Sequence, residues 1–294
     1  MFKSKFLKGV DLTNKDAVYT LINGVKIPVV GFGTWQVQDG KEAYDSVMEA
    51  LKVGYRHIDT AEAYQNEESV GRAIKDSGIP RKELFITTKL WNRHGTYEEA
   101  KQALANSLKR LGLDYVDLYI IHWPNPLKHR PDYETRNKEV YRAMEDAYLE
   151  GKIRSIGVSN FRKHHLEALF KSARIKPMVN QIYVNPSDQE EDVVAFNEEH
   201  DILTEAYSPL GTGKIFEIKS LEMISKKYHK SIGQVVLRWS LEHGYLPLPK
   251  SVTPSRIKEN LDLFDFSLDE EDIKEIDSLH GVVGLAANPD KVDW

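Results

Sequence analysis

Short β-prone runs alternate with helical segments eight times along this chain, and this alternation limits the possible fold more than any other feature. The runs predicted as strands begin at residue 29 and recur at residues 55–58, 84–88, 115–121, 153–158, 178–182, 203–207 and 245–248. Helical segments follow at residues 41–52, 67–75, 97–111, 136–149, 163–171, 190–199, 220–241 and 254–263. The alternation favours a parallel sheet, and eight repeats in 294 residues predict a closed (β/α)8 TIM barrel.

The alternative fold is an open, doubly wound α/β sheet. A sheet of that kind that binds a dinucleotide usually carries a Gly-x-Gly-x-x-Gly turn after its first strand. Residues 31–36 and 211–216 both begin such a pattern, and both lack its third glycine. The sequence therefore favours the barrel.

Two additions to the barrel are predicted at its ends. Residues 18–27 form two short β-prone runs around an Asn-Gly pair, which predicts an N-terminal β-hairpin. Residues 269–279 predict an extra C-terminal helix, and the polar residues 1–16 are interpreted as a loose N-terminal extension. No linker-like or low-complexity segment interrupts the chain, so we expect one domain over residues 1–294.

Composition and charge narrow the class of protein. The net charge is −5, and residues of both signs are spread along the chain without a basic cluster. We therefore expect neither a nucleic-acid partner nor a membrane-surface partner. The absence of cysteine excludes disulfides, thiolate nucleophiles and cysteine-ligated metals. The first residues lack the apolar core of a secretory signal, and no apolar run reaches the roughly 18 residues of a spanning helix. The expected location is the cytoplasm.

Four polar residues stand at or just after the ends of three successive predicted strands. They are Asp59, Tyr64, Lys89 and His122. Each alone has an ordinary explanation, such as a helix cap, a solvated lysine or a packed histidine. In a barrel, however, the carboxyl ends of the strands meet at one mouth, where catalytic groups gather.

The chemistry of the four residues is coherent. A phenol has an ordinary pKa near 10, and a nearby ammonium group such as that of Lys89 would help Tyr64 to release its proton. Asp59 could hold Lys89 charged and oriented, and His122 could bond to the same substrate oxygen. Such a set can polarise a carbonyl and protonate the alkoxide. It is a poor divalent metal site, because a lysine is normally protonated, and no metal is expected.

Residues 54–67, GYRHIDTAEAYQNE, resemble the first signature of the aldo-keto reductase family, and the resemblance extends from about residue 25 to the C-terminus. It implies NADPH-dependent reduction of aldehydes or ketones by hydride transfer. It also implies that Tyr64 is the general acid, that Lys89 and Asp59 assist it, and that His122 orients the carbonyl. The histidine favours carbonyl reduction over double-bond reduction, because double-bond reductases of the family carry glutamate there.

The resemblance also implies a nicotinamide site on the later strands. Ser159, Asn160 and Gln181 would hold the carboxamide, and Tyr207 would stack on the ring. On their own, Ser159 and Asn160 are better explained as the cap of a strand-to-helix turn, and Tyr207 as core packing. The complete predicted cofactor set is Thr34, Trp35, Asp59, Ser159, Asn160, Gln181, Tyr207, Ser208, Leu210, Lys250, Ser251, Val252, Arg256, Glu259 and Asn260.

The last motif, residues 248–260, points to a phosphate. Lys250 and Arg256 flank a turn at a predicted helix start, where free N–H groups and two cations suit a phosphate monoester. An ordinary basic surface turn is the alternative. By resemblance, Ser251 joins these cations on the 2′-phosphate of NADPH, and Glu259 and Asn260 contact the adenine. We therefore expect NADPH to be preferred over NADH.

Large aromatic residues at the strand ends predict an apolar substrate pocket, and structural packing is the nearly equal alternative. The predicted substrate-binding residues are Trp35, Tyr64, Trp91, His122 and Trp123. The segments 123–135 and 281–294 are short, as in the bacterial branch of the family, which includes 2,5-diketo-D-gluconate and methylglyoxal reductases. The resemblance therefore implies an open pocket for small carbonyl compounds.

Two expectations concern the protein as a whole. We expect a monomer, with a weak dimer as the other possibility. The alternative function is a cofactor-binding regulatory or structural barrel without significant turnover, as in potassium-channel β subunits. The complete set of four polar residues favours the enzyme.

Overall fold

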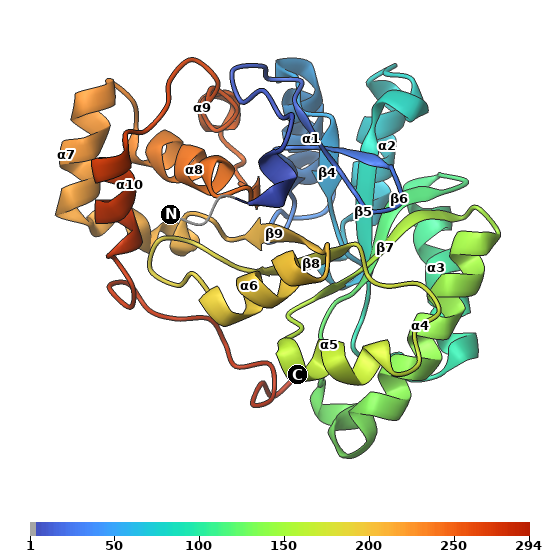
Figure 1. Cartoon of the computed structure of the whole chain (residues 1–294). Coiled ribbons are helices and arrows are strands. Elements are labelled where there is room, and N and C mark those ends of the chain that lie inside the picture. Colours follow the sequence, from blue (N-terminus) through green and yellow to red (C-terminus); the bar gives the residue numbers. More distant parts are fainter. Residues whose placement is uncertain (1–3) are drawn as a thin grey trace.

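A computed structural model describes residues 4–294, in which eight parallel strands form a barrel surrounded by helices (Figure 1). Each strand pairs with the next one along the chain. The strands are β3 (Phe32–Gly33), β4 (His57–Asp59), β5 (Phe85–Leu90), β6 (Val116–Ile121), β7 (Ile153–Ser159), β8 (Val179–Tyr183), β9 (Leu203–Tyr207) and β10 (Leu246–Leu248). The predicted TIM barrel is confirmed.

Hydrogen bonds between the first and last strands close the ring. The Gly31 N–H donates to the Pro247 carbonyl at 3.1 Å, and the Gly33 N–H donates to the Pro249 carbonyl at 3.0 Å. Gly31 is required here, because a side chain at this position would overlap Leu248 and the His57 ring. The last strand thus returns to the first, and all strand ends share one mouth.

Helices cover the outside of the barrel (Figure 1). They are α1 (Lys41–Val53), α2 (Glu67–Asp76), α3 (Tyr97–Leu111), α4 (Tyr133–Leu149), α5 (Lys163–Phe170), α6 (Glu191–Glu199), α7 (Lys219–Tyr228), α8 (Ile232–Glu242), α9 (Pro254–Glu259) and α10 (Glu270–Asp277). The expected extra C-terminal helix is α10. Within residues 4–294, no helix is both long and apolar enough to cross a membrane.

Local capping explains several helix boundaries. Thr96 and Glu99 form a capping box at the start of α3, and Gly112 ends this helix with a φ of 65°. The Ser231 side chain accepts the Gln234 N–H and caps the start of α8. This cap separates α8 from α7. Three helices differ from expectation. The helix predicted over residues 220–241 is divided into α7 and α8, α4 begins at Tyr133 rather than residue 136, and α9 ends at Glu259 rather than near residue 263.

The N-terminal segment is partly attached to the barrel. The predicted hairpin is present as β1 (Val18–Thr20) paired with β2 (Lys26–Pro28). Residues 1–3 of the expected loose extension lie outside the described residues. The expectation is wrong for the part that follows, because the Ser4 hydroxyl donates to the Glu198 carboxylate at 3.0 Å and Lys5 pairs with Asp201 at 2.6 Å. These partners lie almost 200 residues away, so local polarity could not reveal them.

Candidate active site

A buried ion pair joins the ends of β4 and β5. The Lys89 ammonium donates to Asp59 Oδ1 at 2.6 Å and to the Thr60 carbonyl at 2.8 Å. The Lys89 side chain is fully buried, and that of Asp59 is 4% exposed. A charged lysine in this position requires such partners, because an isolated buried charge is strongly unfavourable.

Tyr64 and His122 lie over this ion pair. Tyr64 ends the short 3-10 helix η2 (Glu62–Tyr64) in the loop after β4. The Lys89 ammonium lies 4.8 Å from the centroid of the Tyr64 ring. The His122 ring, which follows β6, meets the Tyr64 ring edge-on at a centroid distance of 5.7 Å. The four residues predicted from separate strand ends therefore form one cluster.

The protonation states of these rings suit proton donation. Burial raises the pKa of Tyr64 well above its ordinary value, and negative charge on Asp59 or Glu205 raises it further, so the phenol carries its proton at neutral pH. Burial and the Lys89 charge lower the pKa of His122 well below its ordinary value. His122 is therefore a neutral imidazole with a single N–H to donate.

Asn66 holds the loops around this cluster. Its amide donates to the carbonyl groups of Thr34 and Val37 at 3.0 and 3.1 Å, and its Oδ1 accepts the Thr60 hydroxyl at 2.8 Å. The Thr34 hydroxyl in turn donates to the Asp59 carbonyl at 2.9 Å. Thr34 was predicted to bind cofactor; the structure places it at the site, fully buried and already hydrogen-bonded to backbone.

The predicted nicotinamide residues lie together beside the cluster. The Asn160 backbone is left-handed, with a φ of 61°, and its side-chain amide donates to the His122 carbonyl at 3.0 Å. Asn160 Oδ1 accepts the Tyr207 hydroxyl at 2.8 Å. The Ser159 hydroxyl donates to the Gln181 carbonyl at 2.7 Å, and the Gln181 amide donates to Asp59 at 2.8 Å. These bonds connect four strand ends to the ion pair.

The predicted phosphate residues lie after β10, next to the start of the barrel. Lys250 and Arg256 are exposed, and neither forms a salt bridge with any residue of the described part of the chain. Ser251 is mostly buried and accepts the Thr253 N–H at 3.1 Å. Two exposed cations without carboxylate partners are free to bind an anion.

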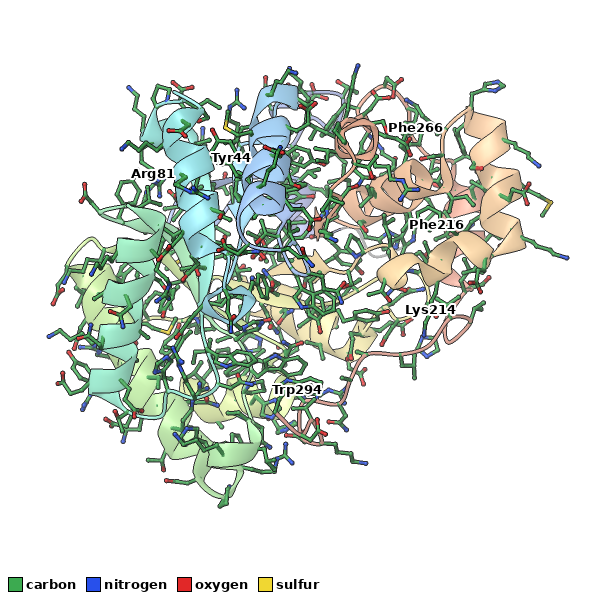
Figure 2. All side chains as sticks on the ribbon, turned by 180° about the vertical axis from the view of Figure 1, so that it is seen from behind. Tyr44, Arg81, Lys214, Phe216, Phe266 and Trp294 are labelled. Atoms are coloured by element: carbon green, nitrogen blue, oxygen red, sulfur yellow. The ribbon has the colours of Figure 1, made fainter. Side chains whose placement is uncertain are left out.

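The other predicted cofactor residues occupy varied surroundings. Val252 and Glu259 are exposed, whereas Asn260 is buried. Ser208 has a φ of 47°, and Leu210 is half-buried. Both precede the 3-10 helical segment η5 (Gly211–Glu217), whose Lys214 and Phe216 are labelled in Figure 2.

Aromatic residues line the region around His122. The Trp91 ring meets the His122 ring edge-on at 5.1 Å. Trp123 is buried and packs against Trp294, with their ring centroids 5.4 Å apart. Trp35 is 45% exposed. Trp294, labelled in Figure 2, is an addition that the sequence did not indicate, because it lies 171 positions from Trp123 in the C-terminal tail.

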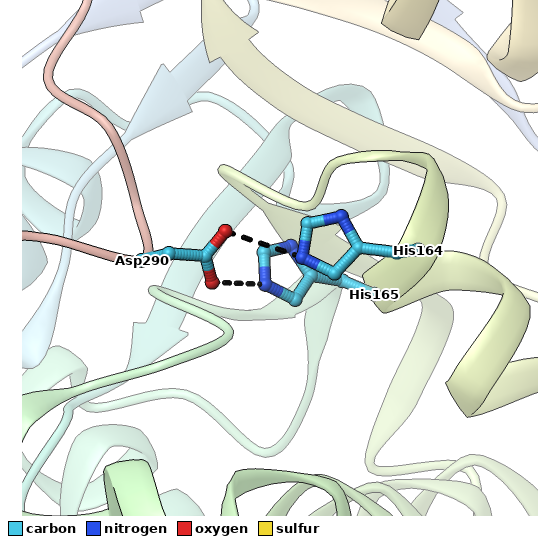
Figure 3. Close-up of side chains that lie close together, drawn as sticks. All are labelled: His164, His165 and Asp290. Atoms are coloured by element: carbon cyan, nitrogen blue, oxygen red, sulfur yellow. Dashed lines mark hydrogen bonds and ion pairs between the residues drawn. The ribbon is translucent and has the colours of Figure 1, made fainter.

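A cluster of His164, His165 and Asp290 fastens this tail to α5 (Figure 3). Asp290 Oδ1 contacts His165 Nε2 at 2.9 Å and accepts the Asn125 amide at 2.8 Å, while Oδ2 lies 3.2 Å from His164 Nε2. His165 Nδ1 accepts the Arg162 N–H at 3.1 Å, so Nε2 carries the ring proton and donates it to Asp290. A protonated Nε2 has no lone pair for a metal. We therefore interpret the cluster as a structural contact that attaches the C-terminal tail to α5.

Glu205 is a buried carboxyl near Asp59 that was not predicted from the sequence. It lies in β9, is fully buried, and accepts the Gln181 amide at 2.6 Å. His57, expected to be structural, bonds the Thr87 hydroxyl at 2.9 Å and lies 3.7 Å from Glu205. The available signal was a lone acidic residue within an otherwise buried strand.

Comparisons with known proteins agree with this geometry. A sequence model of the Aldo/keto reductase family matches residues 29–280. Glyoxal reductase of Bacillus subtilis is 48% identical over 278 residues, which cover 95% of this chain and 98% of that protein. Methylglyoxal reductase DkgA of Escherichia coli is 43% identical over 277 residues, covering 93% of this chain and 97% of that protein.

A solved structure extends the comparison to the fold. The aldo-keto reductase AKR2E4 of Bombyx mori, solved in complex with NADP, has a TM-score of 0.81 and 38% identity, covering 90% of this chain and 92% of that chain. The barrel, the order of its strand-end residues and the extent of these matches lead to one conclusion. The chain belongs to the aldo/keto reductase family.

Proposed function

We propose that this protein reduces small aldehydes or ketones to alcohols with NADPH, and that Tyr64 is the general acid. The observation that carries the proposal is the buried Lys89–Asp59 ion pair beneath Tyr64, with His122 at its edge. This arrangement places a proton donor, a cation and a neutral hydrogen-bond donor at one point of the barrel mouth. Developing charge on a carbonyl oxygen would be stabilised there.

Each residue has a distinct part in the reaction. NADPH supplies the hydride, and the Tyr64 hydroxyl gives its proton to the carbonyl oxygen. The phenolate that remains is stabilised by the Lys89 ammonium, which Asp59 keeps oriented at 2.6 Å. His122 Nδ1 is buried without a hydrogen-bond partner within residues 4–294, so the proton is assigned to Nε2, which donates to the substrate oxygen.

Two features fit NADPH. Gln181 directs its amide nitrogen to two carboxyl groups, at 2.8 Å to Asp59 and 2.6 Å to Glu205, which leaves its carbonyl oxygen for the cofactor carboxamide. Lys250 and Arg256 lack carboxylate partners within residues 4–294, and they would bind the 2′-phosphate that distinguishes NADPH from NADH. The Bombyx mori structure named above was solved with NADP.

The substrate class follows from the pocket and the relatives. Trp91 and Trp123 supply flat apolar surface next to His122. The bacterial relatives are named for the reduction of glyoxal and methylglyoxal. We propose small dicarbonyl compounds of this kind as substrates. A cofactor-binding barrel without turnover is the alternative, and it would bind NADPH without consuming it.

Replacing Tyr64 with phenylalanine tests the proposal. General acid catalysis contributes about 10²–10⁴-fold, so we expect kcat/KM for methylglyoxal to fall by that factor while NADPH binding persists. The control is Tyr141→Phe, since the Tyr141 hydroxyl is buried in α4 and donates to the Ile175 carbonyl at 3.0 Å. That variant should keep its activity. Wild-type turnover by the Tyr64 variant would refute the assigned acid, and a wild-type protein that binds NADPH but reduces none of the carbonyl compounds would favour the regulatory alternative.

A further inference from the structure

Glu205 shares one side-chain amide with the Asp59–Lys89 ion pair. Residue 205 lies in register with Gln181 on the neighbouring strand β8. The Gln181 amide nitrogen donates to Glu205 Oε2 at 2.6 Å and to Asp59 Oδ2 at 2.8 Å. One NH2 group therefore bridges two buried carboxyl groups, and a change at either carboxyl acts on the other.

The surroundings of Glu205 contain one cation. The titratable groups that face it are His57 and Asp59 from β4, Tyr64 from η2 and Lys89 from β5. On β10, the other strand next to β9, Leu246 lies in register with Glu205. Burial and the Lys89 charge lower the pKa of His57 to about 3, so this imidazole is neutral. Lys89 is thus the only positive charge among these groups.

The single cation is already paired. Lys89 contacts Asp59 at 2.6 Å, and although burial raises the pKa of Asp59, this direct contact assigns the negative charge to Asp59. Glu205 is fully buried, and its Oε1 has no hydrogen-bond partner within residues 4–294. A second carboxylate at this place would be uncompensated, which is strongly unfavourable in a buried site.

We propose that Glu205 is a positioning residue for the reduction: its neutral carboxyl holds Gln181 and Asp59 in place, and its ionisation opposes proton transfer from Tyr64. The proposal rests on the proposed function of Tyr64. In agreement with it, burial and the Asp59 charge raise the pKa of Glu205 to about 8. Loss of the proton adds a second negative charge beside Lys89, and this charge disfavours the phenolate that Tyr64 must become.

The consequence is an alkaline limit on carbonyl reduction. If the ionised form is inactive, the rate of hydride transfer falls about tenfold for each pH unit above the pKa of Glu205. Glu205→Gln keeps the shape of the side chain and an oxygen that accepts the Gln181 amide, but it cannot ionise. A purely structural role would change the rate at every pH and leave the shape of the profile unchanged.

The experiment is stopped-flow measurement of single-turnover NADPH oxidation by methylglyoxal across neutral and alkaline pH. We expect the ratio of the Glu205→Gln rate to the wild-type rate to rise about a hundredfold between neutral pH and two units above the Glu205 pKa. Glu145→Gln is the control, because Glu145 lies on the outer helix α4, is also buried, and pairs with Arg174, which follows α5. Its profile should fall with pH as wild type does.

A second measurement covers the case in which the Glu205 variant does not fold. The infrared difference spectrum of the wild-type NADPH complex between neutral and alkaline pH should show the loss of a protonated-carboxyl C=O stretch. Superimposable pH profiles of wild type and Glu205→Gln, or no such carboxyl band, would overturn the proposal. An inactive wild-type protein that still shows the band would instead count against the proposed function alone.

Discussion

The raised pKa of Glu205 predicts that replacing this residue stabilises the protein as pH rises. In the unfolded chain this carboxyl ionises near 4.5, and in the folded protein near 8. Between these values the unfolded chain binds fewer protons than the folded protein, so an increase in pH favours unfolding. The wild-type protein therefore loses stability across this window, whereas Glu205→Gln has no proton to lose.

The magnitude follows from the size of the shift. Each pH unit between 4.5 and 8 widens the gap in unfolding free energy between variant and wild type by about 1.4 kcal/mol, about 5 kcal/mol over the whole window. Below the lower value both states bind the proton and the gap is constant. Above the upper value both states have lost the proton and the gap is constant again.

Urea unfolding monitored by circular dichroism, in steps of one pH unit across the window, measures this gap. Glu145→Gln serves as the reference, because Glu145 is paired with Arg174 at 2.9 Å and its loss should cost a nearly constant amount. A gap between Glu205→Gln and wild type that does not grow with pH would show that Glu205 is ionised in the folded protein. That result would refute the inference that Asp59 carries the only negative charge beneath Tyr64 and that Glu205 is neutral there.

Two further predictions concern the cofactor and the tail. Replacing both Lys250 and Arg256 with alanine removes two exposed cations, and each is expected to contribute about 1 kcal/mol or more through a charged hydrogen bond to the phosphate. We therefore expect the Kd for NADPH to rise about thirtyfold or more, while the Kd for NADH changes little. Equal losses of affinity for the two cofactors in a fluorescence titration would exclude the phosphate role. Asp290→Ala leaves His165 without its acceptor, a penalty of about 1–3 kcal/mol. We expect faster hydrogen exchange in residues 281–294 and a higher KM for methylglyoxal. An unchanged exchange rate would mean that the other contacts of the tail, such as the Val283 N–H to the Ser187 hydroxyl and the packing of Trp294, are sufficient to hold it.

The sequence predicted the parts of the molecule that depend on local signals. The alternation of strands and helices was sufficient for the barrel, because each period can be recognised from a short run of residues. The strand-end residues could be grouped because a barrel brings all strand ends to one mouth. Their positions in the structure agree with that expectation at Asp59 and Lys89, 2.6 Å apart.

Contacts between distant segments were not predictable in this way. The attachment of Ser4 to Glu198 and the packing of Trp294 on Trp123 join positions separated by more than 150 residues. Neither partner carries a pattern that identifies the other. Glu205 was missed for a different reason, because a single acidic residue in a strand usually faces solvent, and only its register with Gln181 reveals that it faces the ion pair.

The tail also affects how the specificity of such an enzyme can change. Trp294 packs against Trp123, which we propose lines the substrate pocket, yet it belongs to a segment that contributes no strand to the barrel. Its anchor at Asp290 reaches α5 rather than the residues around Lys89. Insertions or substitutions in residues 281–294 can therefore reshape the pocket while the proton-transfer groups stay fixed. The range of accepted carbonyl compounds can evolve separately from the chemistry that reduces them.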